Sequence, residues 1–389
     1  MSAVSWPADL SRARVDDLKQ ALSRWRPRLV AAPWRLAATA GLFQGEGTPV
    51  QFVVENADWV IPWMGERLRT EIEGVSPGLF STTTRPQRLV NRVAHFGSQY
   101  MWTAWGPHLS RTNRCVVSFF HGKREDGADV SRHIDEFLAS VPRLSRIITG
   151  AGLIESRLLD WGVPRSKLVR IPIGIDTALF RPPTPAEREL ARAKLAIPTG
   201  AIVVGSFQKD GVGWGEGRVP KLIKGPDVLL KAVERLNRDA PLVVLLAGPA
   251  RGFVKHGLER LGVRYVHLYA KSQAELVECY HALDLYLVTS REEGGPMGLL
   301  ESMASGVPVV STRVGMAPDF IVDGVTGGLA APEDVEGLAE RALGLLALSP
   351  DVAATLKQKA VQSVKICDWY AVAHRHLDEV YLPLVRDAI

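Results

Sequence analysis

Short apolar runs alternate with amphipathic segments along most of the chain. In the first half, apolar runs occupy residues 50–54, 89–97, 114–122, 145–150 and 167–174, and helical patterns separate several of them. The alternation restarts further on, with runs at residues 201–207, 241–248, 263–269, 283–290 and 307–312. Strands that alternate with helices are typical of βαβ units and parallel sheets. The pattern therefore predicts two doubly wound α/β domains.

A proline-bearing segment near residues 176–186 separates the two halves. We expect a first domain over residues 1–176, a second domain over residues 177–368, and a C-terminal helix within residues 369–389 that crosses back to the first domain. Open parallel sheets bind their ligands beyond the carboxyl ends of the strands. We therefore expect a central cleft between the domains, with the functional motifs directly after strands.

Composition narrows the class of protein. Lys and Arg outnumber Asp and Glu by 47 to 42, a mild positive charge that suits anionic ligands or an acidic membrane surface. Cys115, Cys279 and Cys367 show no metal-site or disulfide spacing, so we expect free thiols in a reducing compartment. No apolar run is long enough to span a membrane, and the N-terminus lacks the apolar core of a signal peptide. A cytoplasmic protein without a nucleic-acid partner is expected.

The stretch "SREEGGPMGLLESMASG" (290–306) follows a strand. Pro296 suits the first position of a helix and Gly306 suits the residue after its end. Gly294 and Gly295 then lie at a helix N-terminus, where bare N–H groups attract anions such as a diphosphate. Glu293 and Glu301 could accept hydrogen bonds from sugar and ribose hydroxyls. The alternative makes Glu293 a first-turn acid favoured by the helix dipole and Glu301 a solvated helix residue.

A second stretch, "GSFQKDGVGWGEGRVPKLIKGPD" (205–227), lies between a strand and a helix. It contains alternating glycines and a positive face, formed by Lys209, Arg218, Lys221 and Lys224. Such a loop can wrap phosphates, although it matches neither the P-loop nor the dinucleotide-binding fingerprint. A mobile surface loop with scattered lysines is the alternative.

His121, the absence of some catalytic motifs and the N-terminal segment add further expectations. His121 stands at the end of a predicted strand, where it could bind a sugar hydroxyl or polarise a reacting group, or serve only as a structural histidine. No His, Cys and Asp cluster has metal-ligand spacing, and the Gly-x-Ser-x-Gly motif of serine hydrolases is absent. Residues 8–26 are typical of a helix, and the Trp- and Arg-bearing segment 24–43 either contacts an acidic membrane surface or packs onto the first domain.

Three stretches together resemble retaining glycosyltransferases of the GT-B type, family 4. They are "RIITGAGLIESRLLDWGVPRSKLVRIPIGIDTALFRP", "VVGSF…KGPDVLLKAVERL" and "YHALDLYLVTSREEGGPMGLLESMASGVPVVSTRVGMAPDFIVDGVTGGL". The resemblance covers roughly residues 114–348 and implies two Rossmann-like domains that face a central cleft, the first on the acceptor side and the second binding the donor. The chain departs from the family pattern at Ile173-Gly174, at Pro318-Asp319 and in "ENADWV" (55–60), mostly on the acceptor side.

The resemblance also implies roles for individual residues. His121, Lys224 and Glu293 are the expected catalytic residues. Tyr269, Ala270 and Lys271 are expected near the nucleobase. The expected donor-binding residues are Ser206, Lys209, Arg218, Lys224, Glu293, Gly294, Gly295, Met297, Gly298, Leu299, Leu300 and Glu301. No metal is expected, because the sequence contains no Asp-x-Asp and no His, Cys and Asp cluster with metal-ligand spacing. No cofactor is expected, and a UDP- or GDP-sugar is the expected donor substrate.

The implied reaction transfers a sugar from a nucleotide-diphosphate sugar to an acceptor hydroxyl, with retention at the anomeric carbon, as in glycan biosynthesis. Lysine and helix N–H groups would stabilise the leaving diphosphate without a metal. The acceptor is a glycan, a lipid-linked molecule or a small molecule. The alternatives are a nucleotide-sugar epimerase or phosphorylase of the same fold, and a non-catalytic subunit that binds the nucleotide sugar. For a lipid-linked acceptor, peripheral contact with the inner face of the cell membrane is expected.

Overall fold

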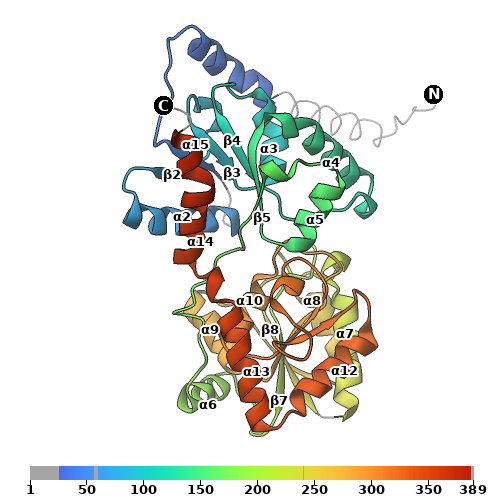
Figure 1. Cartoon of the computed structure of the whole chain (residues 1–389). Coiled ribbons are helices and arrows are strands. Elements are labelled where there is room, and N and C mark those ends of the chain that lie inside the picture. The colour runs from blue at the N-terminus through green and yellow to red at the C-terminus, as the bar shows by residue number, and fades with distance from the viewer. Residues whose placement is uncertain (1–25, 57–59, 240, 387–389) are drawn as a thin grey trace, which may run out of the picture.

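The structure is a computed structural model that describes residues 26–56, 60–239 and 241–386. Figure 1 shows two α/β domains stacked end to end, with the C-terminal helices α14 and α15 beside the first domain. The helix expected over residues 8–26 lies outside the described residues, apart from Arg26. Residues 26–39 are helical.

The first domain contains a six-stranded parallel sheet in the order β2-β1-β3-β4-β5-β6. The strands are β1 (Val50–Val53), β2 (Phe80–Thr83), β3 (Val93–Phe96), β4 (Arg114–Ser118), β5 (Leu144–Thr149) and β6 (Leu168–Arg170). The helices are α2 (Val60–Val75), α3 (Gln99–Trp105), α4 (Ala128–Ser140) and α5 (Gly152–Asp160). Every residue of β1 and β3 is buried, as continuous apolar runs in a sheet covered on both faces require.

The second domain repeats this plan in the order β12-β11-β10-β7-β8-β9, again with every pairing parallel. The strands are β7 (Ile202–Ser206), β8 (Leu242–Ala247), β9 (Arg264–Leu268), β10 (Leu285–Val288), β11 (Val309–Thr312) and β12 (Gly328–Ala330). The helices are α6 (Pro185–Lys194), α7 (Pro226–Asp239), α8 (Gly252–Leu261), α9 (Gln273–His281), α10 (Met297–Ala304), α11 (Ala317–Phe320), α12 (Val335–Leu346) and α13 (Pro350–Ser363).

The predicted α/β class with two doubly wound parallel sheets is confirmed. All ten apolar runs predicted as strands contain one. The sequence missed β2 and β12, which are the outermost strands of their sheets and only four and three residues long. An outermost strand pairs on one side only, so it needs less of the continuous apolar pattern that reveals a central strand.

Two neighbouring segments connect the domains. The N–H of Ile175 donates to the carbonyl of Cys367, and the N–H of Trp369 donates to the carbonyl of Ile175. The chain then continues through α14 (Trp369–His376), a π-helical stretch (Leu377–Tyr381) and α15 (Leu382–Arg386), which return to the first domain (Figure 1). There the Trp369 ring packs edge-on against Trp63 of α2. The two connecting segments are therefore hydrogen-bonded to each other where they pass between the domains.

No helix in the described part of the chain is long and apolar enough to cross a membrane. The described residues likewise contain no group of three or more His, Cys, Asp or Glu side chains placed to hold a metal ion.

Candidate active site

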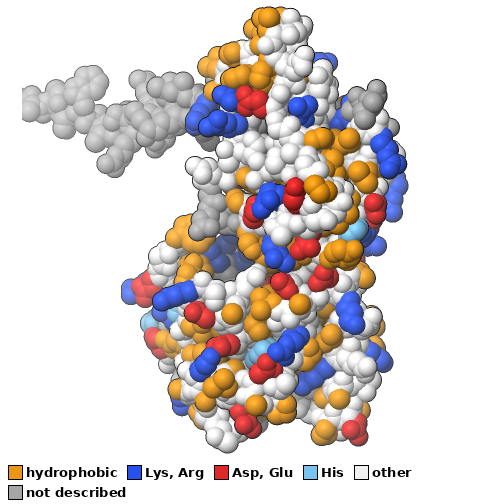
Figure 2. All heavy atoms as spheres, turned by 90° about the vertical axis from the view of Figure 1, so that its left-hand side faces the viewer, with side chains coloured by type: hydrophobic (Ala, Val, Ile, Leu, Met, Phe, Trp, Pro, Cys, Tyr) orange, Lys and Arg blue, Asp and Glu red, His pale blue; other side chains and the backbone are white. Residues whose placement is uncertain are grey.

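A cavity lies between the two domains at the carboxyl ends of both sheets. Figure 2 shows an indentation between the two halves of the molecule, with Lys or Arg side chains in it. The second domain contributes Lys224, Glu293, Gly294, Gly295 and Met297. The lining residues from the first domain and the connecting segment are Val60, Ile61, Met64, Ser98, Gln99, Tyr100, Phe120, His121 and Ile173. The structure thus brings the three expected catalytic residues, His121, Lys224 and Glu293, to one cavity.

Helix α10 begins at this cavity. Pro296 is its N-cap residue, one position earlier than predicted, because its ψ of 98° is extended rather than helical. The helix ends as predicted: Gly306 adopts a φ of +67° and its N–H donates to Met303, while Val307 donates to Ser302. The N–H groups of the first turn have no partner within a helix, so this end of α10 presents a positive dipole to the cavity.

Gly294 and Gly295 carry no side chains, so both a ligand and the first domain can come close to their backbone. A Cβ atom on Gly294 would lie 2.5 Å from the carbonyl oxygen of Phe120, which belongs to the first domain. A Cβ atom on Gly295 would lie 2.4 Å from the Ile173 side chain. The sequence suggested that these glycines let a diphosphate come close to the backbone. The structure shows that close contact between the domains also requires them.

Replacing Gly294 with alanine is expected to lower turnover about tenfold, because the added methyl pushes the two walls of the cavity apart and misplaces the reacting groups. The free energy of unfolding of the second domain should change little. The matched control is Gly344→Ala in α12, where a Cβ would meet no atom within 4 Å. Steady-state kinetics check the prediction, and equal turnover in the two variants would contradict it.

Lys224 and Glu293 form an ion pair across the floor of the cavity. Lys224 Nζ lies 2.5 Å from Glu293 Oε1, and the two side chains are 22% and 10% exposed. The Ser290 hydroxyl donates to the same carboxylate oxygen at 2.9 Å. Glu293 is therefore fixed by two donors. Lys224 presents an ammonium group beside the N-terminus of α10.

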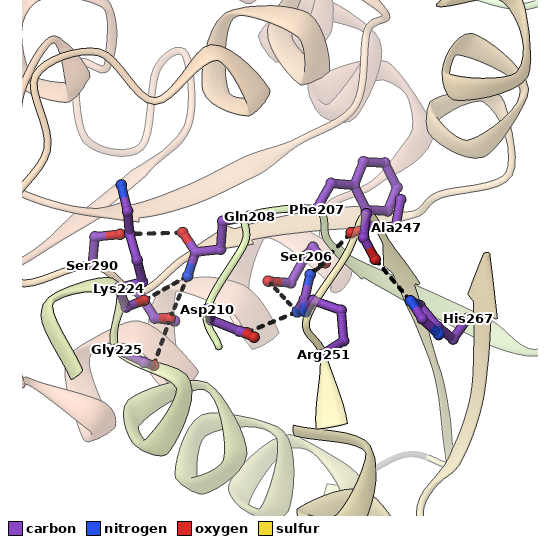
Figure 3. A network of polar contacts seen from close by, with 12 residues as sticks. Ser206, Phe207, Gln208, Asp210, Lys224, Gly225, Ala247, Arg251, His267 and Ser290 are labelled. Atoms are coloured by element: carbon purple, nitrogen blue, oxygen red, sulfur yellow. Dashed lines mark hydrogen bonds and ion pairs between the residues drawn. The ribbon is translucent and has the colours of Figure 1, made fainter. Parts of the chain in front are cut away.

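The turn that carries Lys224 is anchored to the end of β10. Gln208 donates to the Lys224 carbonyl at 2.6 Å, and its amide oxygen lies 3.1 Å from the Ser290 hydroxyl (Figure 3). Gly225 has a φ of +63°, and a Cβ there would lie 1.9 Å from the Thr289 carbonyl oxygen. The Thr289 hydroxyl donates to the Gly225 carbonyl at 2.9 Å. These contacts explain why a glycine follows the lysine.

His121 approaches the same groups from the first domain, three residues after β4. Its ring is accessible from the cavity, but both domains surround it. This enclosure, together with the positive charge of Lys224, lowers the pKa of His121, while Glu293 and Glu292 act in the opposite direction. A neutral imidazole at neutral pH can accept as well as donate a hydrogen bond.

Glu301 is buried, so the alternative of a solvated helix residue is wrong. Its carboxylate accepts a hydrogen bond from the Tyr280 hydroxyl at 2.7 Å. Burial raises the pKa of Glu301 to about 7, and the Tyr280 hydrogen bond lowers it only partly. A carboxylate held in this way has further acceptor capacity for ligand hydroxyls.

The buried Glu301 makes stability depend on pH. Because its pKa in the folded state, about 7, lies above the ordinary value of 4.5, it contributes stability that is complete below pH 4.5 and lost as the pH rises through 7. Relative to Glu301→Gln, the wild-type protein should lose up to about 3 kcal/mol between pH 4.5 and 8. Urea unfolding of both at several pH values measures this difference. The exposed Glu340→Gln serves as control, and parallel pH profiles for wild type and Glu301→Gln would refute the prediction.

The loop between β7 and α7 is fixed by a buried ion pair that the sequence did not reveal. Arg251 Nη2 lies 3.0 Å from Asp210 Oδ2, and both side chains are fully buried. Arg251 also donates to the carbonyls of Ser206 and Ala247 and to the Ser206 hydroxyl (Figure 3). Burial raises the pKa of Asp210 to about 6 and lowers the pKa of Arg251. Ser206, expected to bind the donor, instead turns its side chain to this pair.

Residues 210–221 of this loop form a hairpin whose base packs on the second domain, while most residues toward its tip are exposed at the surface. The N–H of Val212 donates to the carbonyl of Val219, and the N–H of Lys221 donates to the carbonyl of Asp210. Cβ atoms on Gly211 and Gly217 would collide with the Ala250 backbone at 2.2 and 2.4 Å. Gly211 and Gly217 therefore allow the hairpin to lie directly on the segment before α8, whereas Gly213 and Gly215 face open space.

The other expected donor residues are spread around the second domain. Lys209 Nζ lies 3.7 Å from the centre of the Trp214 ring, and Arg218, 79% exposed, pairs with Glu216. The side chains of Leu299 and Leu300 are fully buried, so only their backbone can serve a ligand. Gly298 leaves room for the Tyr286 hydroxyl. Tyr269, Ala270 and Lys271 follow β9 at the carboxyl edge of the sheet.

Sequence reasoning missed the first-domain wall of the cavity and the ionic contacts at its rim. Glu292 accepts hydrogen bonds from Arg157, at 2.6 Å, and pairs with Lys123 at 2.9 Å. Asp319, a departure from the family pattern, accepts from the N–H of Gly152 at 2.8 Å. These acids belong to the second domain and their partners to the first. The position of Ser98-Gln99 directly after a predicted strand was the signal that could have indicated the wall.

Two parallel six-stranded sheets with a cavity between their carboxyl ends define the GT-B fold. Residues 216–347 match the family described as glycosyl transferases group 1. The D-inositol 3-phosphate glycosyltransferase of Saccharomonospora viridis is 35% identical over 233 residues, which make up 56% of this chain and 49% of that protein. The enzyme of the same name from Nocardia farcinica is 27% identical over 365 residues, 88% of this chain and 74% of that protein. The first of these alignments spans about half the length of the relative.

Solved structures of the same fold cover most of the chain. HepE from Anabaena, solved with UDP and glucose, has a TM-score of 0.68 and 15% identity, and the match covers 86% of this chain and 99% of HepE. Sucrose-phosphate synthase from Thermosynechococcus elongatus has a TM-score of 0.69 and 17% identity, covering 87% and 100% of the two chains. These similarities confirm the predicted GT-B fold.

Proposed function

We propose that this protein is a glycosyltransferase that moves a sugar from a nucleotide-diphosphate sugar to an acceptor hydroxyl, with retention and without a metal ion. The observation that carries the proposal is the Lys224–Glu293 pair at the N-terminus of α10, opposite His121. Lys224, Glu293 and Glu301 all lie in the segment that matches glycosyl transferases group 1. The relatives' names and the UDP in the HepE structure support the same activity.

Each group has a part in the proposed reaction. The diphosphate takes the Lys224 ammonium as its partner and lies at the N-terminus of α10, where the positive end of the helix dipole stabilises charge on the leaving group. Glu293 holds sugar hydroxyls, and Glu301 holds the ribose. The bond from the anomeric carbon to the diphosphate oxygen breaks as the acceptor oxygen bonds to the same face of that carbon. The acceptor proton passes to the diphosphate, which departs as a nucleoside diphosphate.

Retention of the anomeric configuration is compatible with the contacts that Glu293 makes in the floor of the cavity. Glu293 Oε1 is already held by Lys224 and Ser290, which reduces its strength as a nucleophile. Same-face attack by the acceptor therefore needs no covalent sugar–enzyme intermediate. Contact between the domains through Gly294 and Phe120 limits the access of water, which would otherwise hydrolyse the donor.

A donor screen tests the proposal. The purified protein is incubated with UDP-glucose, UDP-N-acetylglucosamine and GDP-mannose, each with a panel of sugar, sugar-phosphate and aryl-glycoside acceptors, with and without EDTA, and released nucleoside diphosphate is measured. We expect release from one donor, insensitive to EDTA, and a thermal shift with the matching nucleoside diphosphate. Conversion of the sugar without release would indicate an epimerase, and binding without release would indicate a non-catalytic subunit. Either result would contradict the proposal.

Peripheral membrane contact in the cytoplasm is a further part of the proposal. Leu29, Leu36 and Leu42 are 66%, 66% and 83% exposed. They lie in or beside the helical segment at residues 26–39, where Figure 2 shows hydrophobic side chains at the top of the molecule. Trp34 instead packs against Phe43 and under Arg88, as the alternative expects. Pelleting with anionic liposomes that is lost in Leu29→Ser/Leu36→Ser would support the contact, and no pelleting would refute it.

A further inference from the structure

The wall that the first domain presents to the cavity is apolar and aromatic. Its side chains come from α2, from α3 and from the segments after β4 and β6: Val60, Ile61, Met64, Tyr100, Phe120 and Ile173. Val60 and Tyr100 are 41% and 44% exposed, an unusual fraction for residues of these types that face a cavity rather than open solvent. In the proposed reaction this wall lies opposite the donor groups, so it faces the acceptor.

Two polar side chains of the wall, Gln99 and Ser98, form hydrogen bonds within the protein. The Gln99 amide donates to the carbonyl of His121 at 2.9 Å and accepts from the N–H of Phe120 at 3.3 Å. The Ser98 hydroxyl accepts from the N–H of Tyr100 at 3.2 Å, as the N-cap of α3. Both residues are buried. Of the side chains on this wall, the imidazole of His121 and the Tyr100 hydroxyl are left to meet a ligand.

The wall carries no formal positive charge at neutral pH. Burial lowers the pKa of His121 and raises the pKa of Tyr100, so both groups are neutral. Among the described residues that line the cavity, Lys224 is the one Lys or Arg, and it pairs with Glu293. From the second domain, Lys221 also acts electrostatically on His121 and Glu293, and at the rim Lys123 and Arg157 share Glu292.

Tyr100 provides a flat surface for an apolar group. Its ring stacks on His133 with the centroids 4.0 Å apart and the planes at 14°. Burial lowers the pKa of His133 to about 4, so the stacked partner is an uncharged ring that fixes the orientation of Tyr100. A rigid aromatic face with part of its surface exposed is a strong site for apolar or ring-shaped ligands.

We propose that the acceptor is uncharged and carries an apolar group, alkyl or aromatic, that packs on Tyr100, Val60 and Met64. This inference rests on the proposed function and names its acceptor class. The relatives are named for a phosphorylated acceptor, D-inositol 3-phosphate. A phosphate packed on this wall would lose its water and would meet no cation of the wall itself in return, which is costly.

The experiment compares matched acceptors with a donor that the protein turns over. The probes are phenyl β-D-glucopyranoside, glucose 6-phosphate and inositol 3-phosphate, and the readouts are glycoside formation and, separately, donor hydrolysis. We expect kcat/KM for the phenyl probe to exceed that for either phosphorylated probe by at least about tenfold, the scale on which an apolar pocket discriminates. A preference for a phosphorylated probe, or no use of the phenyl probe, overturns the inference. Absence of nucleoside diphosphate release with every donor and every acceptor would instead count against the proposed function.

Variants of the wall sharpen the result. Tyr100→Ala should raise KM for the phenyl probe about tenfold more than it raises KM for the donor, and Tyr100→Phe should restore it, because the ring rather than the hydroxyl binds. Val60→Lys should shift the preference toward glucose 6-phosphate, with Val60→Gln as the uncharged control. Equal acceptor preferences in wild type, Tyr100→Ala and Val60→Lys would also overturn the inference.

Discussion

Lys224→Ala and Glu293→Ala are each expected to lower turnover by ~100-fold or more, the scale of losing one group that stabilises charge in the transition state. Lys224 is the cation that lines the cavity among the described residues, and no other lining side chain can replace it against a diphosphate. Removing Glu293 loses a sugar contact and releases the ammonium of Lys224.

The matched control for this prediction is Lys231→Ala, an exposed lysine on the adjacent helix α7. Steady-state release of nucleoside diphosphate is the measurement. Because Lys224 and Glu293 contact each other, the double variant should be far less impaired than the product of the single effects. Near-normal rates in both single variants would show that the site is misassigned, and strictly multiplicative losses would show that the two residues act separately.

Arg251→Met is expected to destabilise the second domain by about 3–5 kcal/mol, because it leaves Asp210 buried without a partner charge. The same change frees the carbonyls of Ser206 and Ala247 from their donor. The hairpin of residues 210–221, which leads to Lys224, should loosen, so KM for the donor should also rise. Urea unfolding followed by fluorescence measures the first effect, and donor kinetics measure the second.

Two further variants make this result specific. Asp210→Asn/Arg251→Met removes both charges and should recover part of the lost stability, since no buried charge is left unpaired. Arg260→Met changes an exposed arginine on the same helix and should alter stability by no more than about 0.5 kcal/mol. If Arg251→Met were as stable as Arg260→Met, the ion pair would have no structural role.

The two-domain plan and the positions of His121 and Glu293 shortly after strands follow from local pattern. Apolar runs must be buried, and parallel strands direct their carboxyl ends to one edge, so residues after strands meet there. The pattern failed for β2 and β12, whose four and three residues pair on one side only. It also placed Pro296 one position too far into α10.

Side-chain contacts between residues that are far apart in the sequence could not be predicted from local sequence pattern. The sequence offered Glu301 as a solvated residue or a ribose ligand, but only the packing against Tyr280 shows that it is buried with a pKa of about 7. Ser206 looked like a donor contact, yet Arg251, 45 residues later, takes its side chain. Such pairings depend on which surfaces the fold brings together, and residue type alone does not encode them.

The sequence by itself determined the α/β class, the division into two sheets and the motif "SREEGGPMGLLESMASG" at the start of a helix. Hydrophobic periodicity and the chemistry of Gly, Pro and Glu are local properties, so they can be recognised along the chain. Tertiary structure alone decided that Gly294 makes room for Phe120 and that Lys224 meets Glu293. It also decided that the first-domain wall of the cavity is mostly apolar and aromatic. Those properties arise from the approach of segments that are far apart in sequence.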